Sequence, residues 1–168
     1  MKIREYSRKK NRLRKIPNRY VPEHLSSKDK RVQLNMLKKS RRMYKNKKYF
    51  TRKKVASFKN KKSSHIQNAE RIYGVKNVTP NQDLVKKTGC SLNALNQIVK
   101  KGEGAYYSSG SRPNQTARSW GLARLASSIT GGNAAIVDFH ILKDGCDHKK
   151  KAYILANKRI TKKIKNML

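Results

Sequence analysis

Acidic residues are scarce in this sequence of 168 residues. Nine Asp and Glu stand against 43 Lys and Arg, which gives a formal net charge of +34 at pH 7. Apolar residues are also few, at 36%, against roughly 45–50% in an average globular domain. No stretch approaches the roughly 18 consecutive apolar residues of a membrane-spanning helix, and the charged first residues do not suit a secretion signal. We therefore expect no membrane span and no export by that route, and a large anion as the main partner.

Cysteine is almost as scarce, with Cys90 and Cys146 alone. Two cysteines cannot form the framework of several disulfides that small secreted domains use, so the count favours a reducing compartment. Cys90 falls where the turn of a helical hairpin is usually buried, and we interpret it as inert. Cys146, His148 and His140 lie close in the sequence, but a structural zinc takes four ligands in paired spacings. We predict no metal and no cofactor.

Candidate catalytic groups are few and scattered. General acid–base chemistry needs positioned carboxylates or histidines. Asp138 and His140 beside a serine between positions 108 and 111 would imitate a nucleophilic triad, but serines are abundant and the sequence sets no geometry for them. We therefore predict that the protein is not an enzyme and has no small-molecule substrate.

The positive charge is concentrated in residues 1–62, which hold 25 of the 43 basic residues and 3 of the 9 acidic ones. Such density favours an extended basic arm that orders only on a partner, with one short helix that starts at Ser26-Ser27 and ends near Tyr44. Aromatic residues among the lysines suit a phosphate backbone with bases available for stacking. The alternatives are a solvated tail or a nuclear-import signal. The candidate polyanion- or partner-binding residues are Arg12, Arg14, Lys15, Arg41, Arg42, Lys47, Lys48, Arg52, Lys53 and Lys54.

Residues 63–148 show the periodicity of a compact helical domain, so we predict a mainly α fold. The expected helices begin at caps Ser64, Thr79 and Ser91 and at Asn114. The apolar run 134–142 suits a helix or a buried strand, and we favour a helix. Residues 149–168 form a basic tail with the spacing of an amphipathic helix, which suits an anionic membrane, nucleic acid or an acidic protein.

The stretch 84–102 resembles a helix-turn-helix, because Gly89 separates two short apolar-faced helices. In a DNA-reading protein the second helix would present Asn93, Asn96, Gln97 and Lys100 to the groove, amides to adenine edges and the lysine to phosphate. The alternative is an ordinary helical hairpin whose polar face meets water or another protein.

Three glycines and three serines indicate a loop over residues 102–113. Its backbone NH groups and Arg112 precede a helix, where an anion is favoured, but no phosphate-binding glycine motif is present. We favour a packed loop anchored by Tyr106 or Tyr107.

One long run, KGEGAYYSSGSRPNQTARSWGLARLASSITGG from Lys101 to Gly132, is similar to a known group of sequences. It resembles an uncharacterised domain encoded by large double-stranded DNA viruses of algae and protists, with relatives in phages. The resemblance covers roughly residues 65–147, and the lysine-rich arm is typical of the viral members. It implies a viral source but no activity and no catalytic residues.

A viral source makes the first hypothesis a virion structural protein, a minor capsid protein that bridges capsid subunits and the inner membrane or genome through its basic arm. Its expected partners are major and minor capsid proteins, the anionic inner membrane surface and DNA bound without sequence specificity. We expect it in the capsid, and in host cytoplasm or nucleus during infection. The alternative is a helix-turn-helix DNA-binding protein of such a virus.

Overall fold

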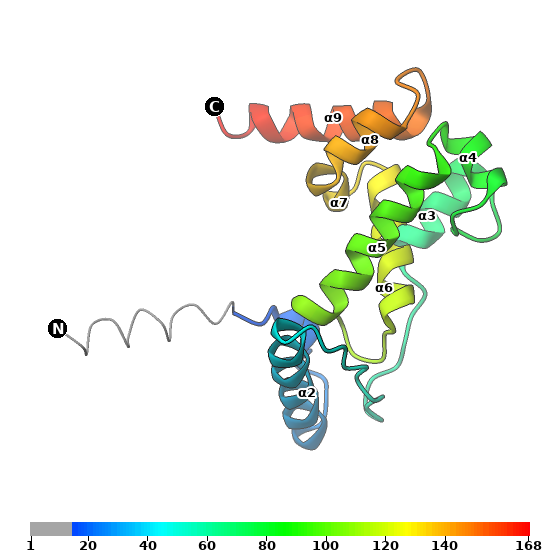
Figure 1. Cartoon of the computed structure of the whole chain (residues 1–168). Coiled ribbons are helices and arrows are strands. Elements are labelled where there is room, and N and C mark those ends of the chain that lie inside the picture. Colours follow the sequence, from blue (N-terminus) through cyan, green and yellow to red (C-terminus); the bar gives the residue numbers. More distant parts are fainter. Residues whose placement is uncertain (1–14) are drawn as a thin grey trace.

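A computed structural model describes residues 15–168, and over this range the protein is mainly helical, as predicted. Figure 1 shows a long central helix with smaller helices gathered around one end and a separate helix at the other. The elements are η1 (Asn18–Tyr20), α2 (Ser27–Lys45), α3 (Ser64–Tyr73), α4 (Gln82–Thr88), α5 (Leu92–Ser108), α6 (Ala117–Ile129), α7 (Asn133–Val137), α8 (Phe139–Gly145) and α9 (Lys151–Lys165). No strand occurs among the described residues, and the run 134–142 forms parts of two short helices, α7 and α8, which are separated at Asp138.

The core is built around the crossing of α5 and α6, where two glycines bring the backbones together. A Cβ on Gly102 would lie 2.5 Å from the Cα of Gly121, and a Cβ on Gly121 would lie 2.6 Å from the carbonyl oxygen of Val99. Both distances are far below van der Waals contact, so neither position accepts a side chain. Leu95, Ile98, Leu125, Ile129 and Leu142 are buried around this crossing.

Asp138 separates α7 from α8 and is fully buried. Its carboxylate accepts two hydrogen bonds from the guanidinium of Arg124, at 2.9 and 2.7 Å, and one from the hydroxyl of Ser128 at 2.8 Å. The Nζ of Lys101 lies 3.1 Å from the same carboxylate. A single buried anion thus joins α5, α6 and the α7–α8 junction, and its charge is fully compensated.

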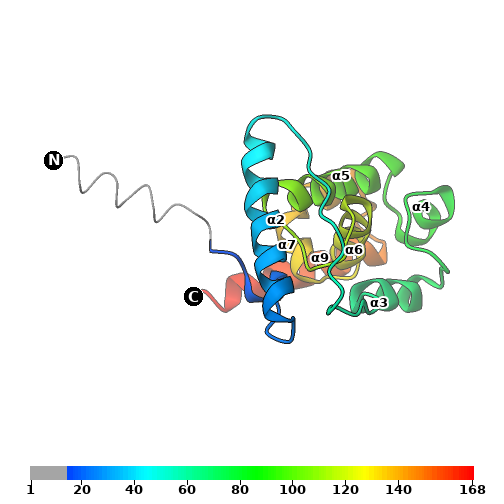
Figure 2. The ribbon, with the colours of Figure 1, turned by 90° about the horizontal axis from the view of Figure 1, so that it is seen from below.

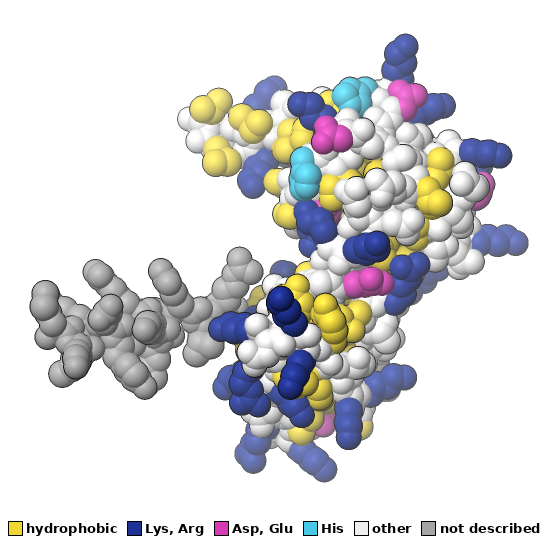
Figure 3. All heavy atoms as spheres, viewed as in Figure 1, with side chains coloured by type: hydrophobic (Ala, Val, Ile, Leu, Met, Phe, Trp, Pro, Cys, Tyr) yellow, Lys and Arg dark blue, Asp and Glu magenta, His cyan; other side chains and the backbone are white. Residues whose placement is uncertain are grey.

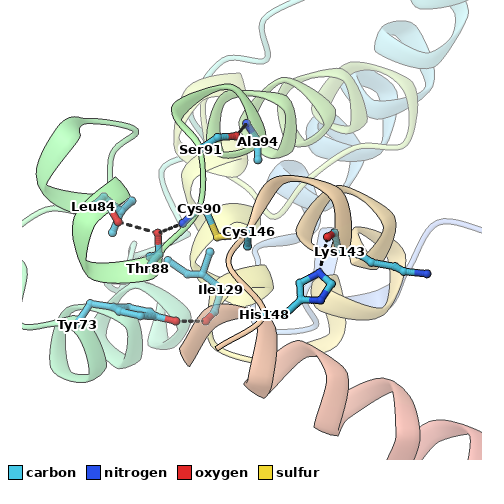
Figure 4. Close-up of a disulfide and its surroundings, with 10 residues drawn as sticks. All are labelled: Tyr73, Leu84, Thr88, Cys90, Ser91, Ala94, Ile129, Lys143, Cys146 and His148. Atoms are coloured by element: carbon cyan, nitrogen blue, oxygen red, sulfur yellow. Dashed lines mark hydrogen bonds between the residues drawn. A yellow bond between two sulfur atoms is a disulfide. The ribbon is translucent and has the colours of Figure 1, made fainter. Parts of the chain in front are cut away.

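Cys90 and Cys146 form a disulfide, which corrects the expectation of two reduced cysteines. The bond joins the α4–α5 turn to the residue after α8, and two backbone hydrogen bonds flank it, from Ser91 N to Gly145 O and from Asp147 N to Gly89 O. Figure 4 shows the bond between these segments. The number of cysteines in the sequence could not show that these two lie close together in space. They are 56 residues apart in the sequence, and only the fold brings them together.

Two predicted helix starts are confirmed. The Ser26 hydroxyl accepts the backbone NH of Asp29 at the start of α2, and the Ser91 hydroxyl accepts that of Ala94 at the start of α5. Three other starts lie one to three residues away from the predicted position, at the caps Ser63, Asn81 and Thr116. The predicted amphipathic helix of the tail is α9, which buries Ala152 and Ala156.

Candidate polyanion interface

Residues 15–62, the described part of the predicted basic arm, pack on the helical domain. Tyr20 and Leu37 are buried against Gly110, whose φ of +117° and lack of a Cβ leave room for both. The Gln33 amide is buried as well and donates to the Tyr20 carbonyl oxygen at 3.1 Å. The charge of this segment does not prevent docking, because a few apolar and polar groups carry the contact while the ammonium groups stay in water. Arg12 and Arg14 lie outside the described residues.

After α2 the chain turns back, and residues 46–58, the returning segment, run antiparallel along the helix (Figure 2). Three contacts fix this register. The Lys39 ammonium lies 4.5 Å from the Phe50 ring centroid, the Lys53 NH lies 3.3 Å from the Met36 sulfur, and the Ser57 NH donates to Asp29 at 2.8 Å. Residues 50–57 therefore lie beside the part of α2 between Asp29 and Lys39.

We call the exposed cationic surface made by α2 and this returning segment the basic face. It has almost no acidic counterpart: residues 15–62 hold 18 Lys and Arg but two carboxylates, Glu23 and Asp29. Asp29 is engaged by Ser57, whose side-chain and backbone hydrogen bonds lower the pKa of the carboxyl. Figure 3 shows basic side chains crowded over the α2 end of the molecule. The basic face comprises Lys38, Lys39, Arg42, Lys45, Lys47, Lys48, Lys53 and Lys54.

The cations of the basic face carry uncompensated charge. With Arg41 left aside, no Lys or Arg of residues 15–61 forms an ion pair with a carboxylate of the described chain. Mutual repulsion among them favours the binding of an external anion. Of the predicted binding residues, Arg42, Lys47, Lys48, Lys53 and Lys54 are exposed on α2 and the returning segment, while Lys15 is exposed before η1.

Arg52 is a correction to the predicted set, because it is buried and serves the fold. Its guanidinium donates to the Ser40 hydroxyl at 3.1 Å, the Tyr106 carbonyl oxygen at 2.8 Å and the Ser111 hydroxyl at 2.7 Å. Burial lowers the pKa of this group. These bonds hold the guanidinium inside the protein, and the position of Arg52 in a run of lysines could not reveal this.

Arg41 is also engaged within the protein. Its Nε and Nη2 both donate to the carbonyl oxygen of Ser109, at 2.9 and 2.7 Å, at the C-terminal end of α5. A cation at a helix C-terminus is favoured by the helix dipole, so Arg41 helps to fix α2 on α5.

The predicted loop over residues 102–113 is mostly helix, because α5 continues to Ser108. Tyr106 is fully buried, as favoured, and Tyr107 is half-buried beside it. Arg112 is exposed on the short connection to α6. The next residues contain a contact that the sequence analysis missed: the Asn114 amide clamps the returning segment through Val55 and Phe58. Its φ of +59°, a conformation that Asn tolerates better than most residues, sets that geometry.

The predicted helix-turn-helix outline is present in α4 and α5, with Gly89 at a φ of +74° between them. Asn93, Gln97 and Lys100 are exposed, and Asn96 is partly exposed. However, α8 lies beside this helix. A shallow hollow of about 250 Å³ is shared by Asn93 and Gln97 with His140 and Asp144 from α8. The two amides thus face a neighbouring helix as well as solvent.

The groups considered for catalysis and metal binding do not come together. Asp138 is held by Arg124 inside the core, while His140 faces the hollow next to α5. Cys146 is bonded to Cys90, and His148 stacks on Tyr153 at 3.9 Å between ring centroids. Over residues 15–168 no three His, Cys, Asp or Glu side chains form a cluster able to hold a metal ion. None of the helices in this range has the length and apolar character of a membrane span.

One comparison with known proteins gives a match. A model of a family described as a family of unknown function, DUF5824, matches residues 17–145, which is more than half of the chain. The match starts before η1, so it includes the docked basic segment as well as the helical domain. No curated protein and no solved structure matches.

Proposed function

The chain belongs to this family of unknown function, and we propose from its own residues that it is a non-enzymatic structural protein that holds nucleic acid by its phosphates on the basic face. One observation carries the proposal. Cations of α2 and of the returning segment lie side by side with no carboxylate of the described chain to pair them, apart from the contacts of Arg41. A row of uncompensated cations on a fixed scaffold suits a phosphate backbone and carries no sequence information.

The setting we propose is a virus particle, with the protein acting as a minor capsid protein. One support is the sequence resemblance to a domain of large DNA viruses. The other is the basic segment of residues 15–62, which is docked on the helical domain and offers its exposed cations to an acidic neighbour. In that setting, capsid proteins and the anionic inner membrane surface are further partners. Intact protein should be present at a fixed copy number in purified particles of the source virus. Its absence from such particles would remove the capsid role and leave nucleic-acid binding standing.

The binding proposal is tested with the full chain and a 20-base-pair duplex over a series of salt concentrations. Each phosphate contact contributes about −0.9 to the slope of log affinity against log salt. Replacing Lys47, Lys48, Lys53 and Lys54 by Gln should make the slope shallower by about 3 to 4.

A matched control removes the same charge elsewhere. The exposed lysines Lys76, Lys86, Lys143 and Lys158 lie on other helices and loops, so the corresponding fourfold Gln variant should keep most of the slope. Equal losses in the two variants would show that net charge alone drives binding, and the basic face would then not be the site.

The helix-turn-helix remains the second candidate, favoured by the observed α4–Gly89–α5 geometry. Against it stands Asp144 of α8, which borders the hollow beside Asn93 and Gln97 and would repel phosphates. If α5 reads bases, changing Asn93, Asn96 and Gln97 to Ala should abolish preference among duplex sequences. Equal affinity of the wild-type protein for all duplex sequences would show that α5 does not read bases.

A further inference from the structure

Four tyrosines form a continuous row from the buried core to the basic face. The ring centroids of Tyr106 and Tyr107 are 5.0 Å apart, those of Tyr107 and Tyr49 are 5.0 Å apart, and those of Tyr49 and Tyr44 are 6.2 Å apart. Each neighbouring pair meets edge to face, with interplanar angles of 90°, 62° and 64°. The row begins at Tyr106, which is fully buried, and ends at rings in contact with solvent.

The outer part of this row is both exposed and held in place. Tyr49 is 68% exposed and Tyr44 is 37% exposed. Two edge-on neighbours hold the Tyr49 ring, so its orientation does not depend on a partner. Between the two tyrosines the chain turns at Lys47, with a φ of +56°, and the NH groups of Lys47 and Lys48 donate to the carbonyls of Tyr44 and Met43. This turn brings the Tyr49 ring into contact with the Tyr44 ring.

Cationic residues precede Tyr49 closely in the chain. Lys45, Lys47 and Lys48 are exposed and lie within four residues of Tyr49 in this turn. In Figure 3 hydrophobic side chains show at the surface of the α2 end among basic ones. An aromatic ring fixed among uncompensated cations is the arrangement by which proteins bind single strands, since bases stack on the ring while ammonium groups hold the phosphates.

We infer that the Tyr44–Tyr49–Tyr107 row is a stacking platform for unpaired bases, so that the ligand of the basic face is single-stranded nucleic acid. This inference rests on the proposed function, because phosphates must first be held there. The bases of a duplex are already stacked on one another, so only a single strand can place a base on Tyr49. Every base has a π face, so the platform recognises unpaired bases without reading their sequence.

The experiment compares three probes of the full chain at one salt concentration. They are a 20-nucleotide oligo(dT), a 20-unit oligodeoxynucleotide whose residues are all abasic, and a 20-base-pair duplex. The first two carry the same phosphates and differ in bases alone. We expect the oligo(dT) to bind at least about tenfold more tightly than the abasic strand, the factor that one stacked base supplies.

Two variants of Tyr49 separate stacking from charge and from folding. Tyr49→Ala should bring oligo(dT) down to the affinity of the abasic strand, while Tyr49→Phe should keep the difference because it keeps the ring. Thermal unfolding checks that both variants are folded. Equal wild-type affinity for the two strands, or a Tyr49→Ala protein that still prefers oligo(dT), would overturn the platform and leave phosphate binding intact. Binding to none of the three probes at low salt would instead refute the proposed function itself.

Discussion

The guanidinium of Arg52 lies on the ring of Tyr106, 3.7 Å from the ring centroid, and closes the contact with three hydrogen bonds. The backbone NH of Arg52 adds a fourth, to the Tyr106 hydroxyl at 3.0 Å. This pair joins the returning segment to α5. The basic face therefore depends on a cation that is itself hidden from any ligand.

Arg52→Lys should destabilise the protein although it preserves the charge. A lysine ammonium cannot reach Ser40, Ser111 and the Tyr106 carbonyl at once, and the unsatisfied buried groups cost about 2–3 kcal/mol. Urea unfolding measures the loss. Its neighbour Lys53 is exposed, so Lys53→Ala should stay within about 0.5 kcal/mol of the wild type. A tolerated Arg52→Lys change would mean that the guanidinium does not fix the segment.

Gly102 and Gly104 give a matched pair within α5. Gly102→Ala would place a methyl group 2.5 Å from the Cα of Gly121, which is backbone and cannot yield locally. We expect a loss of about 2 kcal/mol or more, as for other overpacked sites. A Cβ on Gly104 would meet nothing nearer than the Tyr44 hydroxyl at 3.9 Å. Gly104→Ala should therefore stabilise the helix by about 0.5–1 kcal/mol. Denaturant unfolding of both variants checks the opposite signs.

Asp138 should control stability in acid. Burial raises the pKa of its carboxyl, but the hydrogen bonds and charge of Arg124, with those of Ser128 and Lys101, outweigh it and leave the pKa below its usual value. A group with a depressed folded-state pKa stabilises the fold above its unfolded pKa, roughly 3.9, and this contribution disappears as the pH falls through the folded pKa.

Asp138→Asn should therefore lower stability at neutral pH and flatten the acid side of the stability curve. The variant leaves Arg124 and Lys101 without their buried counter-charge, which costs about 3–5 kcal/mol. Urea unfolding between pH 2 and 7 measures both effects. The exposed Asp144 provides the control, since Asp144→Asn should reproduce the wild-type curve. A parallel offset of the Asp138→Asn curve at all pH values would contradict the assignment of a depressed pKa.

Reducing the disulfide should lower the free energy of unfolding. Cys90 and Cys146 close a loop with a sequence separation of 56, for which the chain-entropy estimate is about 4 kcal/mol. Melting curves with and without reductant measure the change, and a Cys90→Ser, Cys146→Ser double variant should be insensitive to reductant. Titration of two free thiols in the native protein would contradict the bond.

Lys47 should show opposite effects on stability and binding. Its φ of +56° is costly for a side chain with a Cβ and easy for glycine. Lys47→Gly should stabilise the fold by about 0.5–1 kcal/mol, because glycine adopts a positive φ without steric cost. The same change should weaken nucleic-acid binding, because it removes a charge. Lys47→Gln removes the charge alone, so it should weaken binding without the gain in stability. Equal stability of the two variants would show that the turn is unstrained.

Local signals in the sequence predicted most of the helices. Ser26 and Ser91 cap helices and Gly89 ends one, and each does so by contacts with residues only a few positions away. Such roles can be predicted from the local sequence. The same reasoning missed the cap of α4 by two residues, because Thr79-Pro80 and Asn81 are both acceptable starts and local propensity does not rank them.

Long-range partners were beyond the reach of the sequence. Arg52 lies in the same run of basic residues as Lys53 and Lys54, so the local sequence does not distinguish it from them. Its role in the fold comes from its position opposite Tyr106, which is distant in the sequence. Asp138 likewise gains its role from Arg124 and Lys101 on other helices. The high charge of residues 1–62 predicted an extended arm, but it could not show that residues 15–62 dock through a few contacts such as Leu37 against Gly110.

Helix α5 starts next to the cross-linked Cys90 and carries Tyr106 and Tyr107 in its last turn. At 17 residues it is about 25 Å long. One unbroken helix therefore connects the segment docked through Arg52 on Tyr106 with the cross-linked turn at Cys90. Under the proposed function, a pull on a bound strand would act along the length of α5 and not across its packing.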